Sequence, residues 1–379
     1  MRARTGWTAG AGRLGTHDRI DMGMAERVSG GVAVGVDETI APAFKGAGVP
    51  QAGSLGAGIV LAALTAGLAT PAGAAELHVS HQWPTHDMRH QVVQMLADEL
   101  AAADVGLDLR IHPASTLMGP DEQYDALSDG RLDLAVMPLA YAAPKRPEYA
   151  LTLMPGLARN HAHAERLAAS DFMDGIEAIL ARDGIEVLVH GFLAGGLAGR
   201  DGCVSGPDDA RGLKVRAAAG GVFADTLAAA GATPVALSAP EIYDALQTGA
   251  IDAASASSVG FAQDRLFEQV SCYTAPGERA PSLVYQPVLV SARTRAALDP
   301  AQAAALERAS ARAQALYRDE AEREDRRSVE AFRGAGVPVR EMLPEEFEAW
   351  RALARDAARP LVERSAEGAR LLDLALSVD

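Results

Sequence analysis

A repeated sequence pattern is the feature that most constrains how this chain of 379 residues folds. Residues 121–136 read DEQYDALSDGRLDLAV, residues 240–255 read PEIYDALQTGAIDAAS, and matching positions lie 119 residues apart. Each copy predicts a short helix that ends at a glycine and is followed by a buried strand. The identical residues are Glu122 and Glu241, Tyr124 and Tyr243, Asp125 and Asp244, Ala126 and Ala245, Leu127 and Leu246, Gly130 and Gly249, and Asp133 and Asp252.

The surroundings of both copies predict the same order of elements, strand–helix–strand–helix–strand. Two such units in series indicate two α/β lobes with mostly parallel sheets. The first unit has strands at 77–82, 107–113 and 132–137 and a helix at 89–103, with the repeated helix before its last strand. The second unit has strands at 213–216, 233–237 and 251–255 and a helix at 222–230, with the repeated helix in the same place.

Candidate cleft residues follow from this architecture, because ligands of such sheets sit beyond the carboxyl ends of the strands. Trp83 and Tyr285 also carry rings that can wall a pocket, although a single aromatic residue is more often part of a core. The candidates at the strand ends are His81, Gln82 and Trp83; Met137, Pro138 and Leu139; Arg216 and Ala217; and residues 255–258, which include Ser257 and Ser258.

The C-terminal part is expected to be mainly helical. Apolar positions at helical spacing run through 299–332, and at about 1.5 Å per residue such a helix extends roughly 50 Å, enough to lie across both lobes. A strand at 337–342 and helices at 345–358 and 360–376 follow. We expect one lobe to comprise 76–198 plus 284–320, and the other 199–283 plus 321–379, with hinges near 196–200 and 280–285.

The N-terminal region predicts export. Residues 53–68 carry no charge and precede a small-residue site at 72–75, which is the form of a secretory signal peptide. We therefore expect a signal peptide at 51–75, cleavage near Ala74 or Ala75, and a periplasmic protein. A membrane anchor is the alternative, but the run is short for a bilayer span. Residues 1–50 are interpreted as an extension outside the fold.

Composition and motifs exclude several classes of function. Asp and Glu number 50 against 35 Lys and Arg, which argues against a nucleic-acid partner. Two cysteines are too few for a disulfide scaffold. Cys203 and Cys272 could pair after export, but the sequence does not place them within bridging distance. No recognisable catalytic motif occurs, so we expect neither an enzyme nor a cofactor.

Arg216 is the most informative charged residue. It ends an apolar strand and is followed by small residues before a helix, a setting that suits a carboxylate ligand. An ordinary salt bridge between the lobes explains the same pattern. Arg200 follows the glycine-rich run 195–199 where the chain crosses between lobes, and it is either a second ligand residue or a solvated loop arginine.

A cluster of histidines offers a zinc-binding alternative. Residues 78–90 read HVSHQWPTHDMRH, and three of the four imidazoles could converge on a metal ion. Against this, His78 and His81 are three apart on a predicted strand and point to opposite faces. His86 and His90 also fit the solvated first turn of a helix. We therefore expect no metal site.

Several of these segments carry a family resemblance. The second half resembles the core pattern of the solute receptors of TRAP transporters, the dicarboxylate-type extracytoplasmic solute-binding proteins. The first half resembles the family's first-lobe pattern, and the match runs from about Leu77 to the C-terminus. The matching segments are GLKVR at 212–216, GATPV at 231–235, EIYDALQTGAID at 241–252, residues 121–137 and LMPGL at 153–157.

The resemblance implies a periplasmic binding protein fold whose two lobes close on a small organic acid and deliver it to TRAP membrane subunits. It implies that Arg216 binds the ligand carboxylate and that Arg200 is the family's second arginine, although the segment between the two is shorter here. We expect a monomer. The alternative within the same fold is a sensory partner that presents its ligand to a receptor.

Departures from the family pattern narrow the expected ligand. Ala256 stands where the family often has a site asparagine, and Ala239 stands where an aromatic residue is sometimes found. The acid and the tryptophan typical of members that bind a metal–carboxylate complex are absent after the strand at 251–255. We therefore do not expect ligands like sialic acid.

Overall fold

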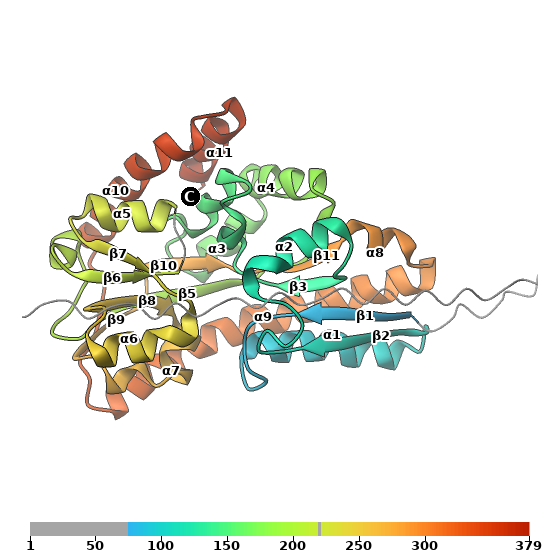
Figure 1. Ribbon diagram of the computed structural model, residues 1–379, viewed down its shortest axis with the longest axis horizontal. Helices are drawn as coiled ribbons and strands as arrows, with labels where there is room; N and C mark the ends of the chain where they lie inside the picture. Colours follow the sequence, from blue (N-terminus) through green and yellow to red (C-terminus); the bar gives the residue numbers. More distant parts are fainter. Residues whose placement is uncertain (1–74, 219–220, 379) are drawn as a thin grey trace, which may run out of the picture. The chain divides into compact units, whose positions relative to one another are not determined.

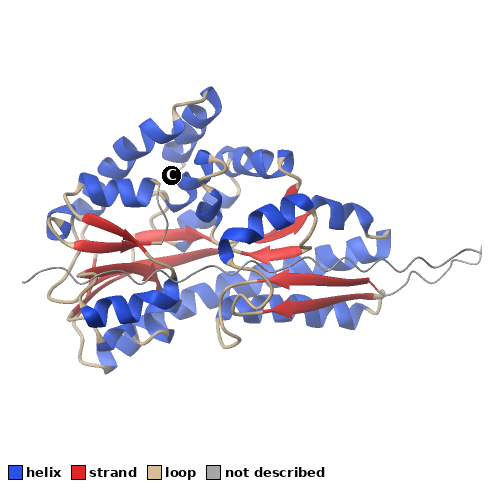
Figure 2. Cartoon of the chain, viewed as in Figure 1, coloured by secondary structure: helices blue, strands red, loops and turns tan. Residues whose placement is uncertain are grey.

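The computed structural model describes residues 75–218 and 221–378, which lie in one compact unit of the chain (Figure 1). The expected extension 1–50 and the apolar run 53–68 of the expected signal peptide lie outside the described residues. Of the helices in the described part, none is long and apolar enough to cross a membrane. Helices flank two sheets (Figure 2), and the α/β class predicted from the sequence is confirmed.

The first sheet has the strand order β2–β1–β3–β11–β4. Successive side chains of a strand point to opposite faces, so Leu134 and Val136 share one core with α1 (Met88–Ala103) and α9 (Pro300–Gly334), whereas Ala135 shares the other with α2 (Pro120–Asp129) and α4 (Asp171–Arg182). The strands are β1 (Ala75–Ser80), β2 (Leu107–His112), β3 (Leu134–Val136), β4 (Ile185–Val189) and β11 (Val288–Ser291).

The second sheet has the order β12–β9–β5–β8–β6–β7, and β10 pairs with β5. On one face Leu197 and Val215 pack with α5 (Val222–Ala229) and α10 (Pro344–Val362). On the other, Tyr273 packs with α6 (Ile242–Thr248), α7 (Ser258–Gln263) and the end of α9. The strands are β5 (Phe192–Gly199), β6 (Lys214–Ala217), β7 (Thr233–Ala236), β8 (Ala253–Ser257), β9 (Cys272–Ala275), β10 (Ser282–Tyr285) and β12 (Val339–Glu341).

Each sheet is parallel except for one strand, and that strand is where the chain enters from the other sheet. β11 runs antiparallel to β3 and β4, and β5 runs antiparallel to β8, β9 and β10. A strand that begins at the edge of the sheet where the parallel strands end must run antiparallel to them. The chain therefore crosses between the sheets at His190–Gly191, before β5, and at Gln286–Pro287, before β11.

These crossings differ from the hinges expected from the sequence. Gly196 and Gly199 belong to β5, a fully buried strand, and the expected hinge at 280–285 overlaps β10. The glycines serve close packing: a Cβ added at Gly196 would lie 2.3 Å from Tyr273 Cε2, and one at Gly199 would lie 2.1 Å from the Gly202 carbonyl oxygen. By hydrogen bonding, β5 and β10 belong to the second sheet, while the expected lobe boundaries 76–198 plus 284–320 and 199–283 plus 321–379 stay a prediction.

Helix α9 contributes to both halves of the fold. Its 35 residues begin after Asp299, whose carboxylate caps the helix by accepting hydrogen bonds from the backbone N–H groups of Ala301 and Gln302 at 2.8 and 2.9 Å. Early residues such as Leu306 pack on α1 beside the first sheet, and Phe332 packs on Tyr273 of the second. Figure 1 shows α9 passing from one sheet to the other. The expected long helix spanning the lobes is therefore present.

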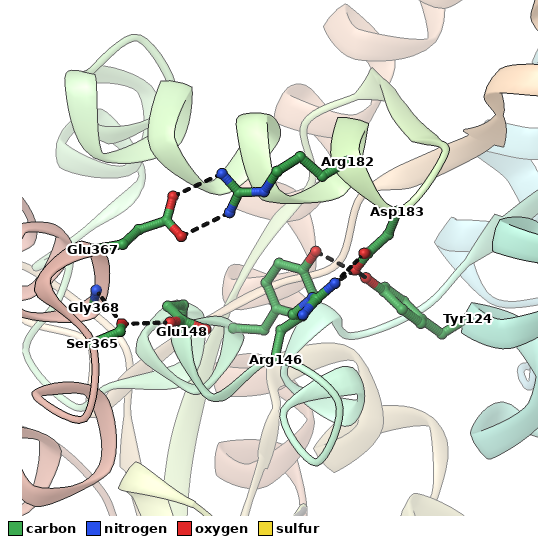
Figure 3. Close-up of polar contacts among 9 residues, drawn as sticks. Tyr124, Arg146, Glu148, Arg182, Asp183, Ser365, Glu367 and Gly368 are labelled. Carbon is green, nitrogen blue, oxygen red and sulfur yellow. Dashed lines mark hydrogen bonds and ion pairs between the residues drawn. The ribbon is translucent and has the colours of Figure 1, made fainter.

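The last two helices connect the same two halves from the opposite side. Trp350 of α10 packs with α5, whereas Leu371 and Leu372 of α11 (Ala366–Ser377) pack in the core with α4. Arg182 at the end of α4 forms a two-bond ion pair with Glu367 at 3.0 and 2.7 Å (Figure 3). The sequence predicted both helices, but not that they pack on different lobes.

A polar cluster beside these helices, with two buried tyrosines and the exposed Arg146, fixes the segment 139–153, which the sequence analysis left unassigned. The Asp183 carboxylate accepts hydrogen bonds from Tyr124 Oη at 2.6 Å and from Arg146 at 2.5 and 2.9 Å (Figure 3). Tyr124 Oη also contacts Tyr149 Oη at 2.9 Å. The segment forms two 3₁₀ turns, η1 (Leu139–Ala142) and η2 (Pro147–Leu153). Helices α3 (His161–Ala168), α4, α7 and α8 (Ala292–Ala297) were also not predicted.

Cys203 and Cys272 form a disulfide, with Cα atoms 4.8 Å apart. The sequence had left this pairing open. The bond joins the loop that follows β5 to the first residue of β9, at the end of β5 that is distant from the crossings.

Candidate functional site

A pocket lies where the carboxyl ends of the strands of both sheets meet. The first sheet and its helix α1 contribute Gln82, Trp83 and Arg89, and the second sheet contributes Arg216 and Ser257. The second crossing contributes Gln286, so the pocket wall includes the junction itself. The remaining lining residues are Pro84, Asp87, Pro138, Tyr141, Leu153, Ala218, Phe223, Ala239, Pro240, Ile242, Ser255, Ala256, Gly260, Gln263, Asp264 and Val284.

Arg216 is the buried cation of the second-sheet wall. It is 4% exposed, and its guanidinium is fixed by hydrogen bonds from Nε to the Leu237 carbonyl at 3.0 Å and from Nη1 to the Ser255 carbonyl at 2.7 Å. Burial lowers the pKa of Arg216, while the neighbouring Tyr141 hydroxyl favours the charged form. Within residues 75–218 and 221–378, no carboxylate lies within ion-pair distance of Arg216.

The first-sheet wall contains a second buried arginine that the sequence analysis missed. Arg89 is 3% exposed and forms a two-bond ion pair with Asp87, from Nε to Oδ1 at 2.7 Å and from Nη2 to Oδ2 at 2.5 Å. Its Nη1 donates to Gln286 Oε1 at 2.9 Å, and its guanidinium lies 3.9 Å from the centre of the Trp83 ring. Arg89 is therefore paired with an anion, Asp87, whereas Arg216 has no anionic partner among the described residues.

The signal for Arg89 was present but ambiguous. Asp87 reads as a helix N-cap, and its Oδ1 does accept a hydrogen bond from the Arg89 backbone N–H at 2.8 Å. An arginine in the first turn of a helix usually points into solvent. The side chain is buried here, where it donates to Gln286, distant in the sequence, and stacks on Trp83.

His81 supports the wall and does not reach the pocket. The Trp83 backbone N–H donates to His81 Nδ1 at 3.3 Å, and His81 Nε2 contacts His90 Nδ1 at 3.1 Å. Burial lowers the pKa of His81 to about 4, so the ring is neutral near pH 7. Among the described residues, no group of three His, Cys, Asp or Glu side chains is arranged to hold a metal ion.

The structure brings seven of the expected residues to the pocket wall: Gln82, Trp83, Pro138, Arg216, Ser255, Ala256 and Ser257. Met137 lies in the core beside Leu127. The Ser258 hydroxyl donates to the Ala194 carbonyl at 3.2 Å. Both are fully buried and do not line the pocket.

Arg200 and Tyr285 also lie away from the wall. Arg200 follows the distal end of β5, where it pairs with Asp201 at 3.1 Å and Asp252 at 3.6 Å. Tyr285 is 1% exposed, and its hydroxyl contacts His190 Nδ1 at 2.9 Å beside the crossing. The arginine that stands opposite Arg216 is therefore Arg89. Ala239 and Ala256, the two departures noted in the sequence, do line the pocket.

Several neutral polar side chains of the wall have no side-chain hydrogen-bond partner in the part of the chain that the structure describes. Gln82, Ser255 and Gln263 form no side-chain hydrogen bond with any other described residue. Ser257 caps α7 by accepting from the Gly260 N–H at 3.3 Å, which leaves its own O–H proton available. The pocket thus offers one unpaired cation and several free hydrogen-bonding groups.

Two α/β lobes joined by crossing strands, with a pocket between their strand ends and a buried cation in it, define a solute-binding protein. Comparison with known families gives the group: residues 79–366 match the model of the DctP family, bacterial extracellular solute-binding protein, family 7, and the chain belongs to this family.

Individual relatives support the assignment to this family. A solute-binding protein of Albidiferax ferrireducens is 32% identical over 307 residues, which cover 79% of this chain and 90% of the relative. The crystal structure of a TRAP periplasmic solute-binding protein from Rhodoferax ferrireducens, with bound malonate, is similar with a TM-score of 0.75 and 30% identity, covering 80% of this chain and 98% of the other. DctP7 of Bordetella pertussis, which binds pyroglutamic acid, shares the fold at 20% identity, with a TM-score of 0.71, covering 80% of this chain and all of the other.

Proposed function

We propose that the protein captures a small organic acid outside the cytoplasm by binding its carboxylate to Arg216. The observation that carries this proposal is that Arg216 is buried, held in place by backbone carbonyls and without a carboxylate partner among the described residues. A buried guanidinium is costly unless it is paired, and its planar fork matches a carboxylate with two hydrogen bonds. Gln82, Trp83 and Ser257 complete the contacts to the ligand.

Two further observations support this proposal. The Rhodoferax relative was crystallised with malonate, a dicarboxylate, and the Bordetella protein binds pyroglutamic acid, a monocarboxylate. The Cys203–Cys272 disulfide fits an oxidising compartment, in agreement with the signal peptide expected at 51–75.

The captured acid is then delivered to the membrane subunits of a TRAP-type transporter, with the receptor acting as a monomer and without chemical change to the ligand. The family consists of extracellular solute-binding proteins, which supports binding as the primary activity. A sensory role would use the same pocket, and the neighbourhood of the gene, beside permease or kinase genes, distinguishes the two.

The test is a titration of the natural ligand. Mass spectrometry of the small molecules released from natively purified protein identifies the acid, and calorimetry then measures its affinity. Arg216→Ala should weaken binding by about 2–5 kcal/mol, or roughly 30-fold to several thousand-fold, because the carboxylate is left buried without a partner. Arg216→Lys should recover part of this, since it keeps the charge but loses the fork.

The matched control is Arg211→Ala, which removes an exposed arginine paired with Asp208 on the same lobe. It should leave the affinity unchanged. Melting curves for all variants separate a loss of binding from a loss of folding. An affinity of Arg216→Ala close to that of the wild type would reject Arg216 as the carboxylate anchor.

A further inference from the structure

We infer that the pocket selects acids with a single carboxylate, and that Asp264 is the residue that disfavours a second one. This inference rests on the proposed function, because it assumes that Arg216 holds the first carboxylate. It concerns the charge of the part of the ligand that does not contact Arg216.

Four charged side chains line the pocket: Asp87, Arg89, Arg216 and Asp264. They are two cations and two anions, so the empty pocket is neutral overall. A carboxylate on Arg216 uses the one cation without an ion-pair partner. A second carboxylate would need another cation, and among the described lining residues the only other one is Arg89.

Arg89 is not available for that purpose. Its two-bond ion pair with Asp87 is almost fully buried, with side chains 4% and 1% exposed. A ligand that took Arg89 would leave the Asp87 carboxylate buried without a partner, and breaking a buried pair in this way is strongly unfavourable. The first-sheet wall therefore behaves as a neutral surface toward the ligand.

Asp264 adds a repulsive element. It follows α7 at the rim of the pocket, and no cation among the described residues lies within ion-pair distance of its carboxylate. Burial raises the pKa of Asp264, while the positive charges of Arg89 and Arg216 favour its ionised form. A second ligand carboxylate in the same pocket meets this negative charge, and such like-charge contacts exclude wrong ligands efficiently.

The groups left free for the far end of the ligand are neutral. Gln82, Ser255 and Gln263 can donate or accept hydrogen bonds and have no partner in the described protein. They suit hydroxyl, oxo or amide groups. The ligand class is therefore a small monocarboxylate with a neutral polar end, such as a hydroxy, oxo or amide acid.

The experiment compares acids that differ only in the second charge. Malonate and succinate are titrated in parallel with their monoamides, malonamate and succinamate, into ligand-free wild-type protein. We expect each monoamide to bind at least about tenfold more tightly than the matching dicarboxylate. Equal affinities, or tighter dicarboxylates, would overturn the inference while leaving the role of Arg216 intact.

Variants then assign the discrimination to Asp264. Asp264→Asn should tighten dicarboxylate binding about tenfold more than it tightens monoamide binding, because only the dicarboxylate has a second charge to place near Asp264. Asp108→Asn, an exposed change of the same chemistry near the amino end of β2, should change neither. An unchanged preference in Asp264→Asn would reject the role of Asp264.

Two controls keep the outcomes distinct. If Arg216→Ala binds all four acids as tightly as the wild type, the proposed function fails rather than the charge selection. If no acid shifts the calorimetric or melting signal of the wild type, the pocket does not take small carboxylates and both proposals fall. We also expect the acid released from natively purified protein to carry a single carboxylate, and a dicarboxylate there would contradict the inference.

Discussion

At the scale of single residues, the wall opposite Arg216 depends on a neutral histidine. His81 is fully buried, accepts a hydrogen bond from the Trp83 backbone and contacts His90. Its pKa is lowered to about 4 because burial disfavours the charged ring. The position of Trp83 is thus tied to the protonation state of a group outside the pocket.

This burial predicts an acid-dependent loss of stability. Between pH 6.5 and 4 the unfolded chain binds a proton at His81 that the folded protein does not, so stability falls as the pH falls through that window. The contribution is about 3 kcal/mol in total. In urea unfolding from pH 7 to 4, His81→Asn should show a shallower decline than the wild type. His86→Asn, at an exposed position, should follow the wild type, and identical slopes for all three would contradict this assignment.

The Asp87–Arg89 pair gives a second residue-scale prediction. Asp87→Asn keeps the shape and the helix cap but leaves Arg89 as a buried charge without an anion, so the free energy of unfolding should fall by about 3–5 kcal/mol. Asp201→Asn removes the exposed partner of Arg200 and should cost less than about 1 kcal/mol. Equilibrium denaturation of both variants measures the difference, and similar small losses would show that the buried pair contributes little.

The same residues show what a sequence can reveal about a site. Arg216 could be predicted because its strand ends in small residues, a local pattern. Arg89 could not, since its burial depends on Gln286, which lies 197 positions away. Arg200 stood next to a glycine run where the sequence predicted a crossing, but it follows β5 at the far side of the sheet.

At the scale of elements, β5 shows that glycines can indicate tight packing as well as flexibility. The hinge expected near 196–200 overlaps the glycine run 195–199, yet this run belongs to a central strand between β8 and β9. A side chain at Gly195 would lie 2.6 Å from the Ala256 carbonyl oxygen, so the neighbouring strands leave no room. Strand formation here is imposed by tertiary contacts that local propensity does not report.

Alanine substitutions test this interpretation of β5. In Gly196→Ala the new Cβ would lie 2.3 Å from Tyr273 Cε2 and 2.6 Å from the Thr274 carbonyl oxygen, so the strand must shift, at a cost of about 1–3 kcal/mol or more. Gly202→Ala, where nothing lies within 4 Å, should stay within about 0.5 kcal/mol of the wild type. Thermal and urea unfolding report both values. A flexible hinge would tolerate the two changes equally.

The disulfide cross-links two segments of the second sheet, the loop after β5 and the start of β9. It closes a loop of 69 positions, and in the chain-entropy account such a bond stabilises the fold by about 4 kcal/mol. Reductant should therefore lower the melting temperature of the wild type. It should not affect the double variant Cys203→Ser, Cys272→Ser, which should melt like the reduced protein. Ligand affinity should stay unchanged, because neither cysteine lines the pocket. An oxidised protein that melts like the reduced one would contradict this prediction.

At the scale of the whole molecule, three segments meet where the two sheets join. The Gln286 N–H donates to the Gly191 carbonyl at 2.7 Å, which links the two crossings, and the Tyr317 hydroxyl of α9 donates to the Gln286 carbonyl at 3.2 Å. The Gln286 side chain in turn accepts from Arg89 in the pocket wall. The sequence repeat predicted the two lobes, but this junction joins residues that share no local pattern.

This arrangement predicts that ligand binding draws the lobes together. Arg216 anchors the acid on the second sheet, whereas Trp83 and Gln82 belong to the first, so the ligand gains its full set of contacts only when both walls approach it. Small-angle scattering should show a smaller radius of gyration when the acid recovered from the purified protein is added to saturation. Arg216→Ala, at the same acid concentration, should keep the radius of the ligand-free protein, because it lacks the anchor. An unchanged radius of gyration for the saturated wild type would contradict this prediction. It would mean that the pocket is already closed without ligand and that the junction at Gln286 is fixed and does not act as a hinge.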